Sequence, residues 1–155
     1  MFYHEIDTEL RDLVFSFFYK FSRFEFALKE NDYAKPRGRN VVSPDWKLFR
    51  EQYEGTYILS SEASDLLENA PLMQVIVNKK LSFITELHAD GDSELRMVVR
   101  SVHRIRNNLF HGGKHGSGSE GDVQRNKYLL GIGCIVLDQL SLLDANIGFD
   151  YPGIY

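Results

Sequence analysis

The sequence predicts an all-α fold: a compact up-and-down bundle of about five helices, formed by a single domain over residues 1–155. Three observations favour this prediction. The length suits one domain, and a chain of this size buries about two thirds of its surface on folding. Apolar residues recur at steps of three and four in three long segments, which is the spacing of one helix face. No internal repeat or linker divides the sequence.

The first of these segments predicts a long core helix that ends near Asn31. Its apolar residues are Leu10, Leu13, Val14, Phe17, Phe18, Phe21, Phe24 and Leu28. Residues 33–40 combine Pro, Gly and three basic residues without apolar rhythm, so we expect a loop there. A short helix around Trp46 should follow, because Ser43 supplies a capping hydroxyl and Pro44 suits the first helical position.

The middle of the chain has a less regular pattern. Residues 60–69 are predicted to form a short helix that Pro71 closes. Residues 72–87 are ambiguous, because the β-branched run Val75–Val77 could suit a strand. We expect a helix there, followed by a turn at Ala89–Asp92.

The last two long segments predict helices on either side of a glycine-rich loop. The apolar stripes are Leu95, Val98, Val99, Val102, Ile105 and Leu109 in the first, and Leu129, Ile132, Val136, Leu140 and Leu143 in the second. Residues 112–121 hold five glycines and should form the loop, because ordering glycine costs the most backbone entropy. Ser119 and Asp122 suit the start of the final helix. Residues 147–155 are expected to form a short C-terminal tail.

Charge is distributed unevenly along the chain. The total is −4, yet the segment from Arg96 to Lys127 holds seven Lys and Arg against two acids. This segment therefore carries +5, and the remaining 11 basic and 20 acidic residues carry −9. Such a basic region is typical of contact with nucleic acid, and equally of an ordinary solvated helix face.

The expected compartment follows from the cysteine count and the N-terminus. Cys134 is the only cysteine, so no disulfide can form within the chain and a reducing compartment is the default. The first residues include acids where a secretory signal has bases. The longest uncharged stretches are about half the length of a membrane span. We therefore expect a cytoplasmic protein without membrane contact.

The candidate chemistry is concentrated where the second long helix ends. Arg106 lies at the margin of the apolar stripe, so its guanidinium can point beyond the helix end toward phosphate oxygens. His111 precedes Gly112 and Gly113, which should end the helix, and the helix carbonyls favour the imidazolium there. A histidine that titrates near neutrality can transfer protons. By geometry alone, His111 could equally be a helix cap, and Arg106 could pair with an acid of the first helix such as Glu25.

The segment Arg106-Asn107-Asn108-Leu109-Phe110-His111 resembles the Arg-x4-6-His motif of HEPN domains, including the polar residue after the arginine. Its continuation Gly112-Gly113-Lys114 is similar to HEPN sequences that read Arg-Asn-x-Leu-Phe-His-Gly-Gly-Lys. The aromatic stretch Phe21–Lys29 also resembles the opening helix of some HEPN groups. The match is specific over about nine residues, and over the rest of the chain it is a match of element order.

The resemblance implies an HEPN-like bundle that dimerises, so that two copies of the motif form one composite active site. His111 would be the acid/base as a ribose 2′-hydroxyl attacks the adjacent phosphate, which leaves a 2′,3′-cyclic phosphate. Arg106 would stabilise charge on the phosphoryl oxygens, and Asn107 would orient either side chain or bind the phosphate. Three residues are candidates for contacts to the RNA backbone: Lys114, His115 and Arg104. Ordinary surface charge explains their presence equally well. The scheme requires no metal and no cofactor.

The hypothesis is therefore a metal-independent RNA endonuclease, used as a toxin or phage-defence effector, with an antitoxin or defence-system protein as a candidate partner. In HEPN toxins paired with small nucleotidyltransferases, a tyrosine often follows the histidine by two residues. Gly113 stands at that position, which argues against this subgroup. Two alternatives remain: a non-catalytic module that binds nucleotides, RNA or a partner protein, and a purely structural dimerisation domain.

Overall fold

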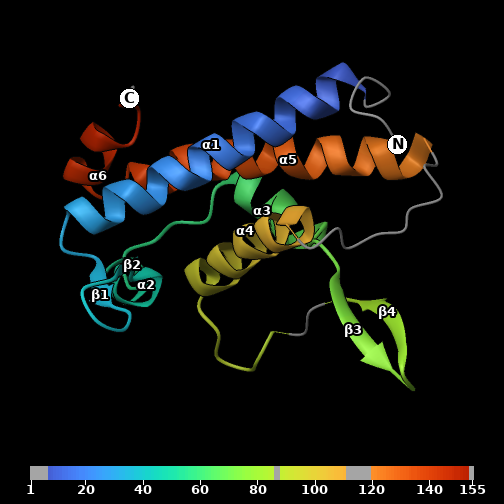
Figure 1. Cartoon of the computed structure of the whole chain (residues 1–155), viewed down its shortest axis with the longest axis horizontal. Coiled ribbons are helices and arrows are strands. Elements are labelled where there is room, and N and C mark those ends of the chain that lie inside the picture. Colours follow the sequence, from blue (N-terminus) through green and yellow to red (C-terminus); the bar gives the residue numbers. More distant parts are fainter. Residues whose placement is uncertain (1–6, 86–87, 111–119, 154–155) are drawn as a thin grey trace.

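The computed structural model describes residues 7–85, 88–110 and 120–153 (Figure 1). Within these ranges the helices are α1 (Thr8–Glu30), α2 (Trp46–Tyr53), α3 (Ser61–Glu68), α4 (Glu94–Phe110), α5 (Glu120–Ser141) and α6 (Ala145–Asp150). The strands are β1 (Ala34–Pro36), β2 (Val42–Pro44), β3 (Met73–Val77) and β4 (Lys80–Ile84). The fold is therefore mostly helical, as predicted. It is not purely all-α, because the strands form two small antiparallel sheets.

The two longest helices, α1 and α5, lie side by side and run in the same direction (Figure 1). Polar contacts join them at two points. Near their first turns the Lys127 ammonium lies 2.7 Å from the Glu9 carboxylate, and further along Lys20 donates to Asp138 at 2.6 Å. Apolar packing between them forms the centre of the bundle.

Helix α3 crosses α5 in the opposite direction. The Ser60 hydroxyl, at the start of α3, donates to the Gln139 side chain at 2.7 Å, whereas Arg125 reaches the carbonyl of Ala70 beyond the end of α3 at 3.2 Å. Helix α4 is antiparallel to α1, since His103 packs on Phe21 whereas Phe110, later in α4, packs on the earlier Phe18. Helices α3 and α4 therefore run in the same direction, which departs from strict up-and-down alternation.

One hydrophobic core receives side chains from all six of these helices. The largest fully buried side chains are Phe17, Phe24, Phe49, Leu28, Leu66, Leu95, Leu137, Leu140, Ile147, Val98, Val102 and Val136. Most of them belong to the stripes predicted from the sequence. The periodicity argument thus identified the core faces of α1, α4 and α5.

The start of α2 corrects one prediction. The N-cap is Asp45, whose carboxylate accepts a hydrogen bond from the backbone N–H of Leu48 at 3.1 Å. Ser43 and Pro44 lie before it in β2, so neither caps the helix nor begins it. The predicted loop at residues 33–40 is partly a strand, because β1 pairs with β2 in a small hairpin. By contrast, the short helix predicted over residues 60–69 is present as α3, and Ser60 is its N-cap.

The predicted helix over residues 72–87 is wrong. Strands β3 and β4 pair antiparallel, with Val77 opposite Lys80 at the closed end. The two turn residues between them, Asn78 and Lys79, have φ values of 50° and 62°. Two successive residues with positive φ form the tight turn that matches strand twist, and β-branched residues favour the strands on either side.

The C-terminal region is more ordered than predicted. Glu120 and Gly121, assigned to the glycine-rich loop, already belong to α5. Part of the predicted tail forms α6, capped by Asp144, and Ile147 within it is fully buried. The buried guanidinium of Arg23 in α1 donates to backbone carbonyls where α6 ends, at Tyr151 and the residue before it.

Candidate active site at the end of α4

Helix α4 presents Arg106 close to its C-terminal end. The side chain is half-buried, and Nη1 donates to Oδ1 of Asn107 at 3.1 Å. The guanidinium carbon lies 4.4 Å from the centre of the Phe110 ring, one helical turn further on. A hydrogen bond on one side and a ring on the other restrict the rotation of the guanidinium. Its N–H fork is therefore held in a defined orientation.

Arg106 has no acidic partner in the described part of the chain. Among the residues that the structure describes, no carboxylate lies within 4 Å of its guanidinium. Glu25, the acid considered from the sequence, instead accepts a hydrogen bond from the indole of Trp46 at 3.0 Å. Arg106 is thus suited to bind an anion brought from solvent.

Two partly exposed aromatic rings lie beside this arginine. Phe18 of α1 and Phe110 have ring centres 5.2 Å apart, and their exposed fractions are 46% and 51%. Contiguous exposed apolar surface can mark a contact with a ligand or partner, and these two rings form a small area of this kind. The end of α4 therefore offers a cation and apolar surface together.

One turn before Arg106, His103 is enclosed rather than exposed. Its ring centre lies 4.6 Å from that of Trp46 and 5.3 Å from that of Phe21, both in edge-to-face geometry. Burial, and secondarily the charge of Arg106, lower the pKa of His103 to about 4. His103 is consequently neutral at physiological pH and serves in packing.

The structure separates the predicted site residues into three groups. Arg106 and Asn107 are brought together by a hydrogen bond. Arg104 is two residues from Arg106 and leaves α4 in a direction about 160° away, so the two arginines do not converge. The others, His111, Lys114 and His115, lie outside the described residues.

Much of the basic charge between Arg96 and Lys127 has structural partners. The Asp92 carboxylate forms ion pairs with Arg96 at 3.1 Å and with Arg100 at 3.0 Å, and only 3% of the Asp92 side chain is exposed. Lys127 lies 2.8 Å from Asp7. Sequence reasoning missed these pairs because both acids lie outside the segment whose charge was counted. The local charge of +5 is therefore not a continuous basic surface.

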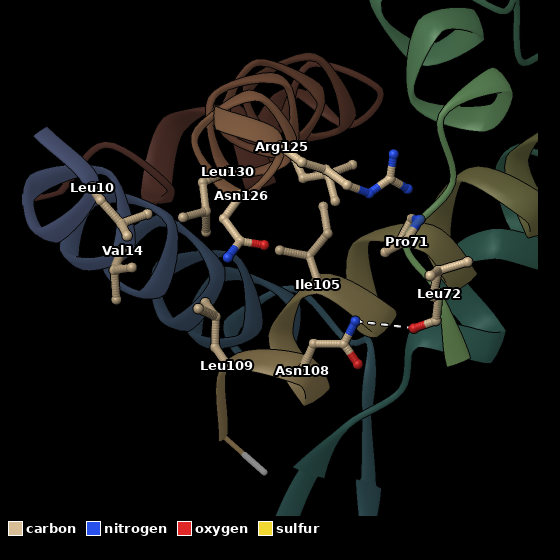
Figure 2. A pocket seen from close by; sticks show the side chains of 11 residues that line it. Leu10, Val14, Pro71, Leu72, Ile105, Asn108, Leu109, Arg125, Asn126 and Leu130 are labelled. Atoms are coloured by element: carbon tan, nitrogen blue, oxygen red, sulfur yellow. Dashed lines mark hydrogen bonds between the residues drawn. The ribbon is translucent and has the colours of Figure 1, made fainter. Parts of the chain in front are cut away.

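A second feature adjoins the end of α4 on another of its faces. A cavity of about 240 Å³ lies between α1, α4 and α5 and is lined mainly by aliphatic side chains. Figure 2 shows the side chains that surround it. The side chain of Asn108 donates to the carbonyl of Leu72 at 3.1 Å and so attaches the start of the β3–β4 hairpin to α4. Asn126 also faces the cavity (Figure 2). The cavity is smaller than most ligand sites, and Asn108 acts within it as a structural tie.

Comparisons with known proteins returned nothing: no family model, no curated protein and no solved structure matches this chain. Within the described ranges, no helix is long and apolar enough to cross a membrane. The same residues contain no group of three or more His, Cys, Asp or Glu that could hold a metal ion.

Proposed function

We propose that this chain is a metal-independent RNA endonuclease of the HEPN type, which acts as a toxin or phage-defence effector. One observation supports it above the others. Arg106 is oriented by Asn107 at the end of α4, without an acidic partner in the described part of the chain, and the motif histidine follows five residues later in the sequence. An arginine of this kind can stabilise the charge that develops on a phosphoryl group.

In the proposed reaction a ribose 2′-hydroxyl loses its proton to His111 and attacks the adjacent phosphorus. The bond from phosphorus to the 5′-oxygen breaks, and that oxygen takes up a proton from a second histidine. Two copies of the chain, each supplying Arg106 and His111, provide both groups in one composite site. Asn107 is a positioning residue, because its side chain holds the guanidinium. The products are a 2′,3′-cyclic phosphate and a 5′-hydroxyl.

The test compares the wild type with His111→Ala and Arg106→Ala on total cellular RNA in EDTA, followed by analysis of the 3′ ends. Cleavage by the wild type alone, with cyclic phosphate ends, is the expected result. Lys29→Ala serves as the control, since it removes one exposed positive charge at the far end of α1. Equal cleavage by wild type and His111→Ala would show that a contaminating nuclease or another site is responsible.

The positioning role of Asn107 has a separate signature. Asn107→Ala should lower kcat with little change in KM, because Arg106 keeps its charge but loses its orientation. Sedimentation of the same proteins should show dimers for all variants. A monomeric but fully active wild type would remove the composite site from the proposal.

A non-catalytic binding module is the second candidate. The contact between Arg106 and the Phe110 ring favours it, because such stacking stabilises an arginine that only holds a phosphate or a partner. Intact RNA with every variant, together with RNA binding that Arg106→Ala weakens, would support this candidate against the endonuclease.

A further inference from the structure

A groove rich in basic residues lies between the β1–β2 hairpin, α2 and α4, with a volume of about 430 Å³. Five cations line it: Lys35, Lys47, Arg50, Arg96 and Arg100. Among the residues that the structure describes, no acid lines it. We call this feature the basic groove. In Figure 1 it corresponds to the region where α2 and the β1–β2 hairpin lie beside the first half of α4, away from the β3–β4 hairpin.

The two lysines of the basic groove are held only loosely by acids. Lys35 Nζ lies 3.8 Å from Asp45, and Lys47 Nζ lies 3.6 Å from Glu51, both beyond hydrogen-bonding distance. Their side chains are 53% and 70% exposed. Exposed pairs of this length contribute little attraction, so both ammonium groups can exchange the acid for a stronger anion.

Arg50 gives a more specific indication. Its Nε is buried yet has no hydrogen-bond partner among the described residues. The nearest carboxylate, that of Glu54, is 4.0 Å away. A buried donor without an acceptor is costly, and such a group in a native structure calls for a ligand or water to complete it. Arg50 also lines the basic groove, so an anion bound there would lie beside a guanidinium whose charge is only weakly paired.

The two arginines from α4 are fixed in place by Asp92, at 3.1 Å for Arg96 and 3.0 Å for Arg100. A guanidinium carries five N–H donors in a planar fork, so it can bind a carboxylate and a phosphate together. Asp92 does not line the basic groove. The side chains of these arginines are therefore held in position, whereas the side chains of the two lysines can change position when an anion binds.

The basic groove shares a helix face with the candidate active site. Arg96, Arg100, His103 and Arg106 follow one another at steps of three or four along α4, and the first three line the groove. At 1.5 Å per residue, Arg96 and Arg106 are separated by about 15 Å along the helix axis. An extended polyanion that follows this face would pass several cations before it reaches Arg106.

We propose that the basic groove binds the phosphodiester backbone of single-stranded RNA and guides the strand toward Arg106. The choice of RNA as the ligand rests on the proposed endonuclease function, whereas the affinity for phosphate rests on the groove itself. Loosely paired lysines suit a polymer better than a compact ligand, because they can follow successive phosphates.

The experiment measures binding of a short fluorescein-labelled single-stranded RNA by anisotropy, over a series of salt concentrations. All proteins carry His111→Ala so that the RNA stays intact. The test variant adds Lys35→Glu and Lys47→Glu. The control adds Lys79→Glu and Lys80→Glu in the β3–β4 hairpin, which makes the same charge change on exposed residues away from the groove. Thermal melting should confirm that all of them are folded.

The groove variant should bind at least about tenfold more weakly than its parent, and the slope of log K against log salt should fall by about 1.4, or about 0.7 for each lost phosphate contact. The control should keep both values. Equal weakening in the two double variants, or no weakening in the groove variant, would overturn the proposal. Displacement of the RNA by AMP at equal concentration would also overturn it, in favour of a nucleotide site.

Cleavage assays with His111 intact separate this proposal from the endonuclease. If the wild type cuts RNA, the groove variant should raise KM and leave kcat nearly unchanged. If the wild type does not cut RNA, and the groove variant still binds RNA more weakly than its parent, the endonuclease proposal fails and the basic-groove proposal stands. If RNA is cut and the groove variant binds it normally, the groove fails and the endonuclease stands.

Discussion

Gly133 allows the three long helices to approach each other, and replacing it tests that packing. A Cβ atom at this position would lie 2.8 Å from Cε2 of Phe17 in α1 and 3.0 Å from Cδ1 of Ile105 in α4. Phe17 is fully buried, so its ring cannot swing out into solvent. Ile105 directly precedes Arg106. Any shift of α4 that accommodates the new methyl group would therefore also move the candidate active site.

The expected size of the effect follows from two opposing contributions. Inserting a methyl group into a packed core costs about 1–3 kcal/mol. Replacing glycine by alanine inside a helix contributes about 1 kcal/mol of stability. A methyl group added at Gly131 in the same helix would meet nothing within 4 Å, so Gly131→Ala gains the second contribution without the first. The two variants should differ by about 1–3 kcal/mol, with Gly133→Ala the less stable.

Urea unfolding followed by circular dichroism measures both free energies of unfolding. Subtracting one variant from the other removes the intrinsic helix preference and leaves the packing contribution. Gly133→Ala should also cut RNA more slowly than Gly131→Ala if the proposed function is correct. Equal stability of the two alanine variants would refute the close contact of α1, α4 and α5 at this point.

Three further changes test other parts of the structure. Tyr53→Phe removes a 2.6 Å hydrogen bond to the Asp144 carboxylate and should lower the free energy of unfolding in urea by about 1.5–3 kcal/mol. The control Tyr57→Phe should lower it far less. Similar losses in the two variants would contradict a stabilising role for the Tyr53 hydrogen bond. Since His103 has a folded-state pKa of about 4 and an ordinary value of 6.5, the unfolded chain binds the proton first, and stability falls as pH drops from 6.5 toward 4. This contribution should make the protein about 2 kcal/mol less stable at pH 5 than at pH 7. His103→Phe should remove that difference in stability. An unchanged pH dependence in this variant would contradict the assignment of the difference to His103. Burial raises the pKa of the Cys134 thiol from 9.0 to about 11, so alkylation by iodoacetamide at pH 8 should be about 100-fold slower in the folded protein than in urea; equal rates would show that the thiol is accessible.

The long helices could be predicted because their signal is local and repeated. In α1 and α4, apolar residues return every three or four positions, and the predicted stripes contain side chains as fully buried as Phe17, Leu28 and Val98. A single misplaced residue does not erase such a pattern. A short-range signal also marks the end of α1, because Asn31 follows Glu30 directly and is the C-cap of the helix.

The short elements could not be predicted in the same way. A helix of six residues such as α6 contains too few turns to show a periodicity, and burial of Ile147 depends on contacts made by the whole bundle. The β3–β4 hairpin is decided by its turn, where Asn78 tolerates positive φ but Lys79 gives no warning of it. The tie from Asn108 to the chain before β3 is a tertiary contact that no local pattern contains.

The candidate site also has a part that could be predicted from the sequence and a nearby groove that could not. The contacts of Arg106 with Asn107 and Phe110 join neighbours on one helix, so helix geometry and the motif together indicated where the arginine would lie. The basic groove brings together residues as distant in sequence as Lys35 and Arg96. Only the tertiary arrangement of α2, α4 and the β1–β2 hairpin creates it.

The charge of a segment is consequently a poor guide to the charge of a surface. Arg96, Arg100 and Lys127 were counted together from the sequence, yet the structure pairs the first two with Asp92 and the third with acids at the start of α1. Lys47 was counted with the acidic remainder and lines the basic groove. If position in the fold decides RNA affinity, Lys47→Gln should weaken binding more than Lys127→Gln, although the sequence segment suggests the reverse order. Binding that instead follows the segment, with Lys127→Gln the weaker of the two, would mean that RNA contacts the end of α5 rather than the groove.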